Sequence, residues 1–138
     1  MRKERNVPEK ASEPEFRASV VQLILNGKAE AALGLLAEQY NVDLPRIRVG
    51  LPSRHRKNSI GCYTAKNQTI SVLNSDTLKE PSVVLHEFYH HLRTSIDMKH
   101  RGTEKYAGEF AEEFIKAYLS SITNNSQHAE EHSEKDNV

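Results

Sequence analysis

The chain has 138 residues, of which 37% are hydrophobic and 28% are charged, and its 19 basic and 19 acidic residues give a formal net charge of zero. This length and composition predict one globular domain with a modest core, and the balanced charge argues against a general affinity for nucleic acid or an anionic membrane. Because the sequence has no apolar stretch that could span a bilayer, no apolar signal segment in its polar N-terminus and a single cysteine, Cys62, we expect a cytoplasmic protein without a disulfide framework or a membrane partner.

Two helices are predicted in the first third of the chain. The charged segment 1–13 is expected to be a flexible arm, and apolar residues at helical spacing predict one helix over 15–25 and another over 29–40. Asn26-Gly27 ends the first helix and Asn41 the second, because both residue types suit the left-handed conformation that closes helices. The second helix lacks the basic face that a helix-turn-helix DNA-binding protein needs. We therefore interpret the pair as packing scaffold.

After residue 44 the apolar period changes from helical to two, which indicates strands. We expect strands over 46–51 and 69–73, a shorter one near 62–65, and a turn at Lys66-Asn67-Gln68. Together they would form a small, mostly antiparallel sheet. An exposed sheet edge beside a cleft can bind an extended peptide as an added strand. We assign that role to 69–73; the alternative is that this segment is an internal strand.

A short basic run, Arg54-His55-Arg56-Lys57, lies between the first two predicted strands. Such a run is usually a solvated loop. Together with Arg46 and Arg48 it leaves open a nucleic-acid-associated function for the segment 46–57. Zero net charge predicts at best weak and salt-sensitive binding, so we do not expect nucleic acid to be the main partner.

The segment His86-Glu87-Phe88-Tyr89-His90 has the pattern H-E-x-x-H within a predicted helix, for which Ser75 or Asp76 is the expected cap and Pro81 lies in the first turn. Residues four apart on a helix lie within roughly 40° of each other and one turn apart, so both imidazoles can reach one metal ion. Two imidazoles that hold Zn²⁺ and a carboxylate, here Glu87, that takes the proton of a metal-activated water form the zinc hydrolase arrangement. The alternative is a solvated polar face opposite the apolar side of the helix.

A hydrolytic zinc site normally needs a third protein ligand. Thr103 is the predicted N-cap of a second amphipathic helix that extends to residue 122. Glu104 shares the apolar, inward face of this helix with Ala107 and Ala111, whereas the other acidic residues fall on the opposite side. We therefore predict Glu104 as the third ligand. Glu109 stays as the alternative, because its spacing from the second histidine occurs in some zinc peptidases.

The two segments 86–90 and 104–111 resemble the gluzincin pattern H-E-x-x-H followed by E-x-x-A-[D/N]-x-[F/Y]-A. The pattern is similar to that of the minimal soluble gluzincins (minigluzincins) and of ImmA/IrrE-type peptidases, and the resemblance covers about 44–122. It implies a zincin-like fold with Glu87 as the general base. It also implies that zinc is held by His86, His90 and Glu104.

Gly108 departs from this pattern, because such families have Asp or Asn at that position to support the site. Loss of support for a ligand can lower metal affinity or activity about 10- to 100-fold. This departure keeps open a zinc-stabilised binding or regulatory module without turnover. The residue that would bind a developing oxyanion is also open; the candidates are His91, Arg93 and His100. Structural packing is the expected role of three tyrosines, Tyr63, Tyr89 and Tyr106.

Taken together, the sequence predicts an α+β, zincin-like domain over 14–123, in which a small sheet packs with the H-E-x-x-H helix and a following ligand-bearing helix. The expected function is a zinc-dependent metallopeptidase that hydrolyses a peptide or protein substrate through a metal-activated water, with Glu87 as the catalytic residue. The polar segment 124–138 is expected to be a disordered tail. In that tail His128 and His132, four residues apart, are expected to be solvated rather than to form a second metal site.

Overall fold

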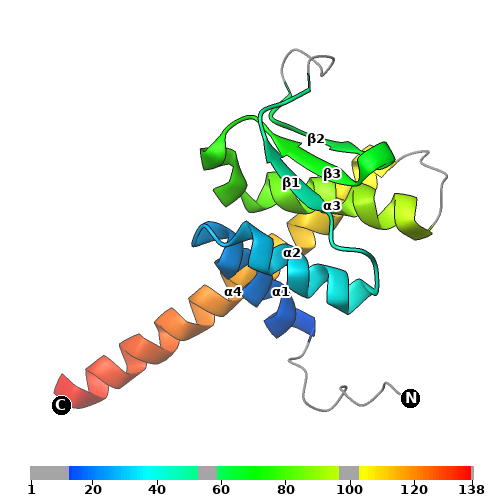
Figure 1. Cartoon of the computed structure of the whole chain (residues 1–138). Coiled ribbons are helices and arrows are strands. Elements are labelled where there is room, and N and C mark those ends of the chain that lie inside the picture. Colours follow the sequence, from blue (N-terminus) through cyan, green and yellow to red (C-terminus); the bar gives the residue numbers. More distant parts are fainter. Residues whose placement is uncertain (1–12, 53–58, 97–102, 138) are drawn as a thin grey trace.

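A computed structural model of the chain describes residues 13–52, 59–96 and 103–137, and beyond residue 123 only the backbone. The basic run at 54–57 and His100 lie outside these ranges, as does most of the predicted N-terminal arm. The elements combine α-helices with a small sheet, which confirms the α+β class (Figure 1). In chain order they are α1 (Glu13–Leu25), α2 (Ala29–Tyr40), β1 (Arg46–Val49), β2 (Gly61–Thr64), η1 (Ala65–Asn67), β3 (Thr69–Val72), η2 (Ser75–Lys79), α3 (Pro81–Ile96) and α4 (Thr103–Asn137).

The first two helices begin and end close to their predicted positions. At the end of α1, the N–H of Lys28 donates to the carbonyl of Leu23 at 2.8 Å, and the N–H of Gly27 donates to the carbonyl of Ile24 at 3.0 Å. Gly27 has φ +82°, the left-handed conformation that this closure requires. Asn41, with φ 58°, closes α2 in the same way. Both helices pack their apolar faces into the core, as expected for a scaffold.

The sheet has the strand order β1-β3-β2, with β1 parallel and β2 antiparallel to β3. A mostly antiparallel sheet was therefore the wrong expectation, since one of these two pairs is parallel. β3 is the central strand and all of its residues are buried, so the assignment of 69–73 as a peptide-binding edge is also wrong. Its small or apolar side chains can be covered on both faces of the sheet, which suits an internal position.

The two edges of the sheet differ in their surroundings. β2 packs against α3, whereas β1 lies on the far side of β3 (Figure 1). β1 ends at Val49, before the predicted residue 51, because Gly50 takes the left-handed φ of +113°. Arg46 and Arg48 of β1 are exposed. The edge strand beside the motif helix is therefore β2.

The helix that carries the H-E-x-x-H motif, α3, begins directly at Pro81. Ser75 and Asp76 do not cap it, which corrects the prediction, because they belong to the short 3₁₀ helix η2. Asn74 caps η2, since its side-chain oxygen accepts hydrogen bonds from the backbone N–H of Thr77 at 3.0 Å and from the Thr77 hydroxyl at 2.8 Å. Proline suits the first position of α3 because its nitrogen would have no intrahelical partner there.

The last helix, α4, begins at Thr103, as predicted to within one residue, and continues to Asn137. The backbone of 124–137 is thus helical, in a segment for which the polar sequence predicts either disorder or a poorly packed extension. This segment contains neither glycine nor proline, the two residue types that most disfavour a helix interior, and it includes three helix-forming glutamates. Figure 1 shows its end projecting away from the rest of the molecule. Among the described helices, none is both long enough and apolar enough to cross a membrane.

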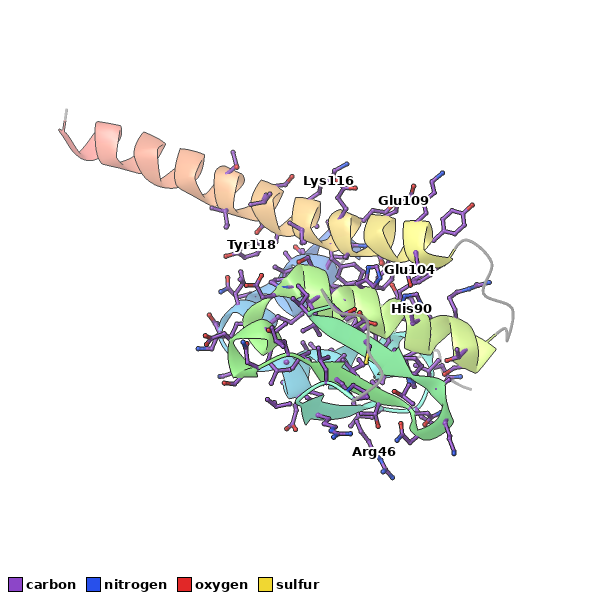
Figure 2. All side chains as sticks on the ribbon, turned by 90° about the horizontal axis from the view of Figure 1, so that it is seen from above. Arg46, His90, Glu104, Glu109, Lys116 and Tyr118 are labelled. Carbon is purple, nitrogen blue, oxygen red and sulfur yellow. The ribbon has the colours of Figure 1, made fainter. Side chains whose placement is uncertain are left out.

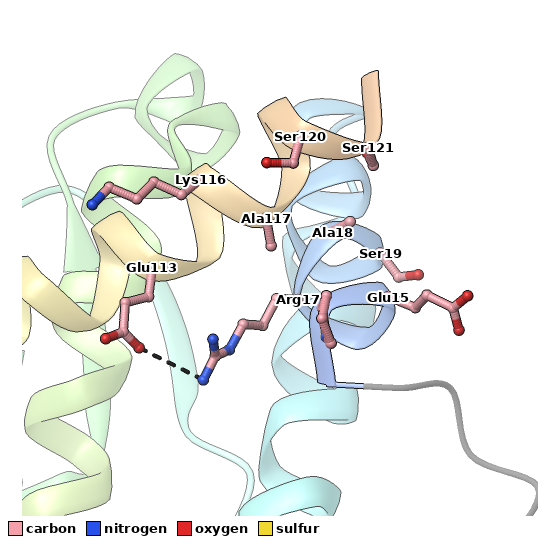
Figure 3. A pocket seen from close by; sticks show the side chains of 10 residues that line it. Glu15, Arg17, Ala18, Ser19, Glu113, Lys116, Ala117, Ser120 and Ser121 are labelled. Atoms are coloured by element: carbon pink, nitrogen blue, oxygen red, sulfur yellow. Dashed lines mark ion pairs between the residues drawn. The ribbon is translucent and has the colours of Figure 1, made fainter. Parts of the chain in front are cut away.

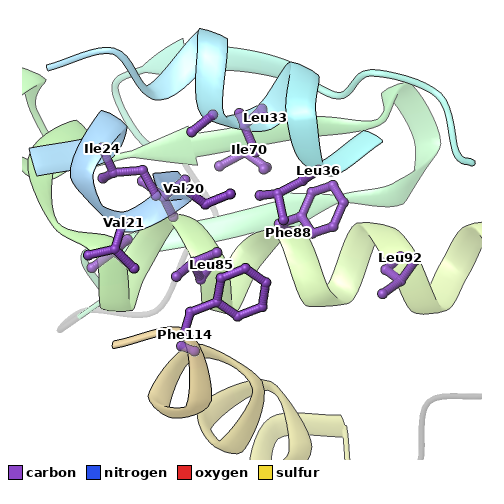
Figure 4. Close-up of a cluster of buried hydrophobic side chains, with 14 of the residues drawn as sticks. Val20, Val21, Ile24, Leu33, Leu36, Ile70, Leu85, Phe88, Leu92 and Phe114 are labelled. Carbon is purple, nitrogen blue, oxygen red and sulfur yellow. The ribbon is translucent and has the colours of Figure 1, made fainter. Parts of the chain in front are cut away.

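The core lies where α1, α2 and the sheet meet the apolar side of α3 (Figure 4). α4 packs along both α1 and α3. Ala107 and Ala111 of α4 are only 0% and 4% exposed, so their small side chains permit the close helix approach that the sequence predicts. The largest fully buried side chains include Phe88, Phe114, Ile24, Leu33, Leu36, Ile70 and Leu85.

Candidate metal centre

The three predicted ligands converge between the middle of α3 and the first turn of α4. Nε2 of His86 lies 2.9 Å from Oε1 of Glu104, and Nε2 of His90 lies 3.1 Å from Oε2 of the same carboxylate. The two imidazole rings, one helical turn apart, have centroids separated by 5.0 Å. Figure 2 shows His90 and Glu104 facing each other from the two helices. The helical spacing within α3 and the packing of α4 therefore bring the three side chains together.

The donor atoms of this group suit a zinc ion. Two imidazole nitrogens and one carboxylate oxygen, all within 4.8 Å of one another, form the His₂Glu set that catalytic zinc sites use, with a fourth position open to water. Ligands about 2.0 Å from a tetrahedral ion are roughly 3.3 Å apart, slightly more than the 2.9 and 3.1 Å between histidine and glutamate here. The Glu104 side chain is 80% exposed, so it can make this small adjustment freely.

Glu87 is buried beside this group, with only 8% of its surface exposed. Loss of solvation on burial, followed by the negative charge of Glu104, raises the pKa of Glu87 to about 7. A cation held by the neighbouring ligands would lower this pKa again, because positive charge favours the carboxylate. A carboxyl group that titrates near neutral pH can both accept and return a proton during a reaction.

Gly61, the first residue of β2, belongs to the site although we did not predict it. A Cβ atom at this position would lie 2.8 Å from Cγ1 of Val83 and 3.4 Å from Oε2 of Glu87. The missing side chain therefore lets β2 approach α3 closely and cover Glu87. In the sequence the only signal was a glycine at the start of a short strand, which more often marks a turn.

Backbone groups of β2 are directed away from the sheet beside Glu87. The N–H of Leu73 donates to the carbonyl of Ile60 at 3.0 Å, which continues the antiparallel register of β2 and β3. Hydrogen-bonded and non-hydrogen-bonded pairs alternate in such a ladder, so Gly61 and Tyr63 direct their N–H and carbonyl groups to the free edge. Within the described residues no further strand pairs with this edge. An extended peptide could therefore pair with it.

Other predicted candidates lie elsewhere. Glu109, the alternative ligand, is exposed, and Figure 2 shows it on the side of α4 that faces away from His90. Gly108 is also exposed, and a Cβ atom there would meet nothing within 4 Å, so this position provides no support to the ligands. Of the oxyanion candidates, His91 is fully buried and cannot reach a substrate, which leaves the partly exposed Arg93 within the described residues.

The tyrosines and the cysteine near the site have structural surroundings. Tyr63 hydrogen bonds to a buried histidine, and the ring of Tyr89 packs 5.3 Å from that of Phe110, as expected for packing residues. Tyr106 differs, because half of its surface is exposed. For Cys62, burial is the main cause of a raised pKa, so the thiol stays protonated at neutral pH and is a poor nucleophile.

A separate cavity of about 980 Å³ opens between α1 and α4, away from the metal ligands (Figure 3). The guanidinium of Arg17 is already engaged there: it lies 3.6 Å from a carboxylate oxygen of Glu113 and 3.3 Å from one of Glu13, and over the ring of Phe114 at 5.6 Å. The charges around the opening are of both signs. These features do not select one class of ligand, so we place the chemistry of the protein at the His86, His90 and Glu104 group.

Comparisons of the chain with protein-family models, with curated proteins and with solved structures find no match. The resemblance to gluzincins therefore rests on the residues of the two short motifs. The inference of function has to come from the chemistry of the site, namely three convergent donor atoms, a buried carboxyl group and a free strand edge.

Proposed function

We propose that the protein is a zinc-dependent metallopeptidase that hydrolyses peptide bonds in a peptide or protein substrate. The observation that carries this proposal is the convergence of His86, His90 and Glu104 beside the buried Glu87. A purely structural zinc site would use four protein ligands and would not need a buried carboxyl group next to it.

Each residue of the site has a distinct part in the proposed reaction. His86, His90 and Glu104 would hold the ion, which when bound supplies Lewis acidity to a water molecule and to the scissile carbonyl. Glu87 accepts the proton of the attacking water and delivers it to the leaving amine. The free edge of β2 orients an extended substrate, because the outward backbone groups of Gly61 and Tyr63 pair with no further strand in the described part of the chain.

Glu87→Gln separates catalysis from metal binding, because it removes the base but no ligand. The variant should keep close to one zinc per chain and the wild-type circular dichroism spectrum, while its hydrolysis of a diverse peptide library should fall at least about 100-fold. Mass spectrometry of the library gives the measurement. Cleavage at the same rate by wild type and variant would contradict the proposal and would point to a contaminating peptidase.

One observation favours a second candidate, a zinc-stabilised binding module without turnover. Gly108 leaves the ligands without the side-chain support that Asp or Asn gives in the resembling families. Among the described residues, a Cβ atom at this position would meet nothing within 4 Å. The same experiment distinguishes the two candidates. Full zinc loading of the wild type together with no cleavage of any peptide in the library would favour the binding module.

A further inference from the structure

A buried histidine directly follows the second zinc ligand in α3. His91 is fully buried, and its Nε2 lies 2.6 Å from the backbone carbonyl of Asp43. A carbonyl oxygen only accepts, so Nε2 donates to it. The other ring nitrogen, Nδ1, lies 2.7 Å from the hydroxyl of Tyr63 and forms a hydrogen bond with it. Burial raises the pKa of Tyr63, so its hydroxyl stays protonated at neutral pH.

These two hydrogen bonds connect three parts of the fold at the candidate metal centre. Tyr63 belongs to the edge strand β2, His91 to α3, and Asp43 to the connection between α2 and β1. Tyr63 lies on the same face of β2 as Gly61, because residues two apart share a face of a strand. This face lies toward Glu87, since a Cβ atom at Gly61 would be 3.4 Å from Oε2 of Glu87. The rings of Tyr63 and His91 also meet edge to face at 5.4 Å.

We propose that Tyr63 and His91 are positioning residues that hold the free edge of β2 in register with the metal centre. The proposal rests on the peptidase function above and adds to it the residues that align the substrate. β2 is short, and among the described strands it pairs only with β3. Its place along α3 therefore needs a directional contact, and apolar packing alone is not directional.

The consequence concerns substrate alignment rather than metal binding. A peptide that pairs with Gly61 and Tyr63 takes its position from β2, while the ligands take theirs from α3 and α4. The hydrogen bond between Tyr63 and His91 connects β2, which positions the peptide, to α3, which carries two of the ligands. Displacement of a bound substrate by about 1 Å can cost on the order of 100-fold in rate, so a bond that fixes the strand is worth more to the reaction than its part in stability.

Tyr63→Phe tests this role, because it removes only the hydroxyl and keeps the ring that packs on His91. The matched control is Tyr118→Phe, which removes the same atom from a tyrosine on α4 far from His90 (Figure 2). The probe is fluorescein-labelled casein, an unfolded protein, added to the zinc-loaded full chain. We expect kcat for Tyr63→Phe to fall at least about fivefold with KM changed less than about twofold, because the peptide still pairs with β2 but is displaced from the metal centre. Zinc content should stay at the wild-type level. Tyr118→Phe should match the wild type.

A second measurement does not depend on activity. In ¹H–¹⁵N spectra of the zinc-loaded chain, Tyr63→Phe should shift the His91 ring nitrogens and the amide signals of β2, including Gly61, whereas Tyr118→Phe should leave both unchanged. If the wild type cleaves no casein, the peptidase proposal fails and the spectra alone decide whether the Tyr63 hydroxyl holds β2. Unchanged β2 signals in Tyr63→Phe, or an unchanged kcat in an active enzyme, would overturn the positioning role.

Discussion

Glu87 is buried, although the sequence pattern places it on the polar face of its helix. A helical projection puts it with the histidines on the polar side of α3, yet it is only 8% exposed. The strand β2 crosses over it at Gly61, which has no side chain to keep the two elements apart. Burial without a cation partner is costly for a carboxylate. In the metal-free protein the ionised Glu87 should therefore lower the free energy of unfolding.

The first prediction follows from the raised pKa of Glu87, about 7 against 4.5 for an unperturbed group. Between these values the folded protein binds more protons than the unfolded chain, so stability falls as pH rises through this window. Glu87→Gln stays neutral and escapes this loss. In metal-free protein the variant should therefore gain about 1–3 kcal/mol relative to wild type between pH 4.5 and 8. Urea unfolding at several pH values measures the difference.

The control for this effect is Glu109→Gln, because Glu109 is exposed on the same protein and should not change the pH dependence. If the stabilities of wild type and Glu87→Gln changed in parallel over this pH range, Glu87 would not be buried in the way that the structure shows.

The second prediction concerns the zinc ligands. Purified wild-type protein without an affinity tag should carry close to one zinc ion per chain, and His90→Ala should lose it, because two remaining donors hold the ion poorly. Glu104→Ala should weaken zinc binding by more than about 100-fold, since even supporting residues around a ligand contribute 10- to 100-fold. Glu109→Ala should have no effect. Elemental analysis and competition with a zinc chelator provide the measurements.

His132→Ala is the matched control, because His128 and His132 repeat the four-residue spacing outside the proposed site. Zinc content that depends on His132 but not on His90 would move the metal to the C-terminal helix. A larger effect of Glu109→Ala than of Glu104→Ala would contradict the arrangement of α3 and α4.

Among the secondary-structure elements, the positions of the strands were predictable but their order was not. Alternating apolar residues identify 46–49 and 69–72 as strands, because the period of two is a local property. Which strand is central depends on pairing between segments far apart in sequence. β1 pairs in parallel with β3, although β2 lies between them in the sequence. No short-range signal specifies such a crossover. The edge was for this reason assigned to the wrong strand.

The third prediction tests the close approach of β2 and α3. Gly61→Ala should destabilise the protein by about 1–3 kcal/mol, because the new Cβ atom would lie 2.8 Å from Cγ1 of Val83 and force the elements apart. It should also reduce peptide hydrolysis, because the same Cβ atom would lie 3.4 Å from Oε2 of Glu87 and would displace this carboxyl group. Gly34→Ala in α2 is the control: its Cβ atom would meet nothing within 4 Å, so it should stabilise the helix by roughly 0.5–1 kcal/mol.

Thermal and urea unfolding of the two variants provide the comparison. If Gly61→Ala were as stable as wild type and fully active, β2 would not depend on close contact with Glu87, and the role of this glycine would have to be abandoned.

Over the whole molecule, the formal charge is balanced. Arg46 and Arg48 are exposed on β1, the edge opposite β2, and the basic run at 54–57 lies outside the described residues. The two sheet edges are thus chemically different: one carries arginines and the other lies beside Glu87. A nucleic-acid function and a peptidase function would use different edges of the same small sheet.

The fourth prediction separates these functions. Arg46 and Arg48 changed together to Ala should leave zinc content and peptide cleavage nearly unchanged, because neither residue belongs to the proposed site. Wild type should bind labelled single- and double-stranded DNA weakly, and binding should vanish at physiological salt. Fluorescence anisotropy gives the measurement. Tight, salt-resistant binding that the double variant loses would make nucleic acid the main partner instead.

Short-range patterns in the sequence were sufficient to identify the ends of the first two helices, the approximate strand positions and the His86, His90 and Glu104 group. Each depends on spacing within one segment or on the polarity of one helix face. The burial of Glu87, the central place of β3 and the part of Gly61 required the folded chain, because each arises where residues distant in sequence meet. The pKa of a side chain and the free edge of a strand are properties of that packing, and spacing along the chain does not contain them.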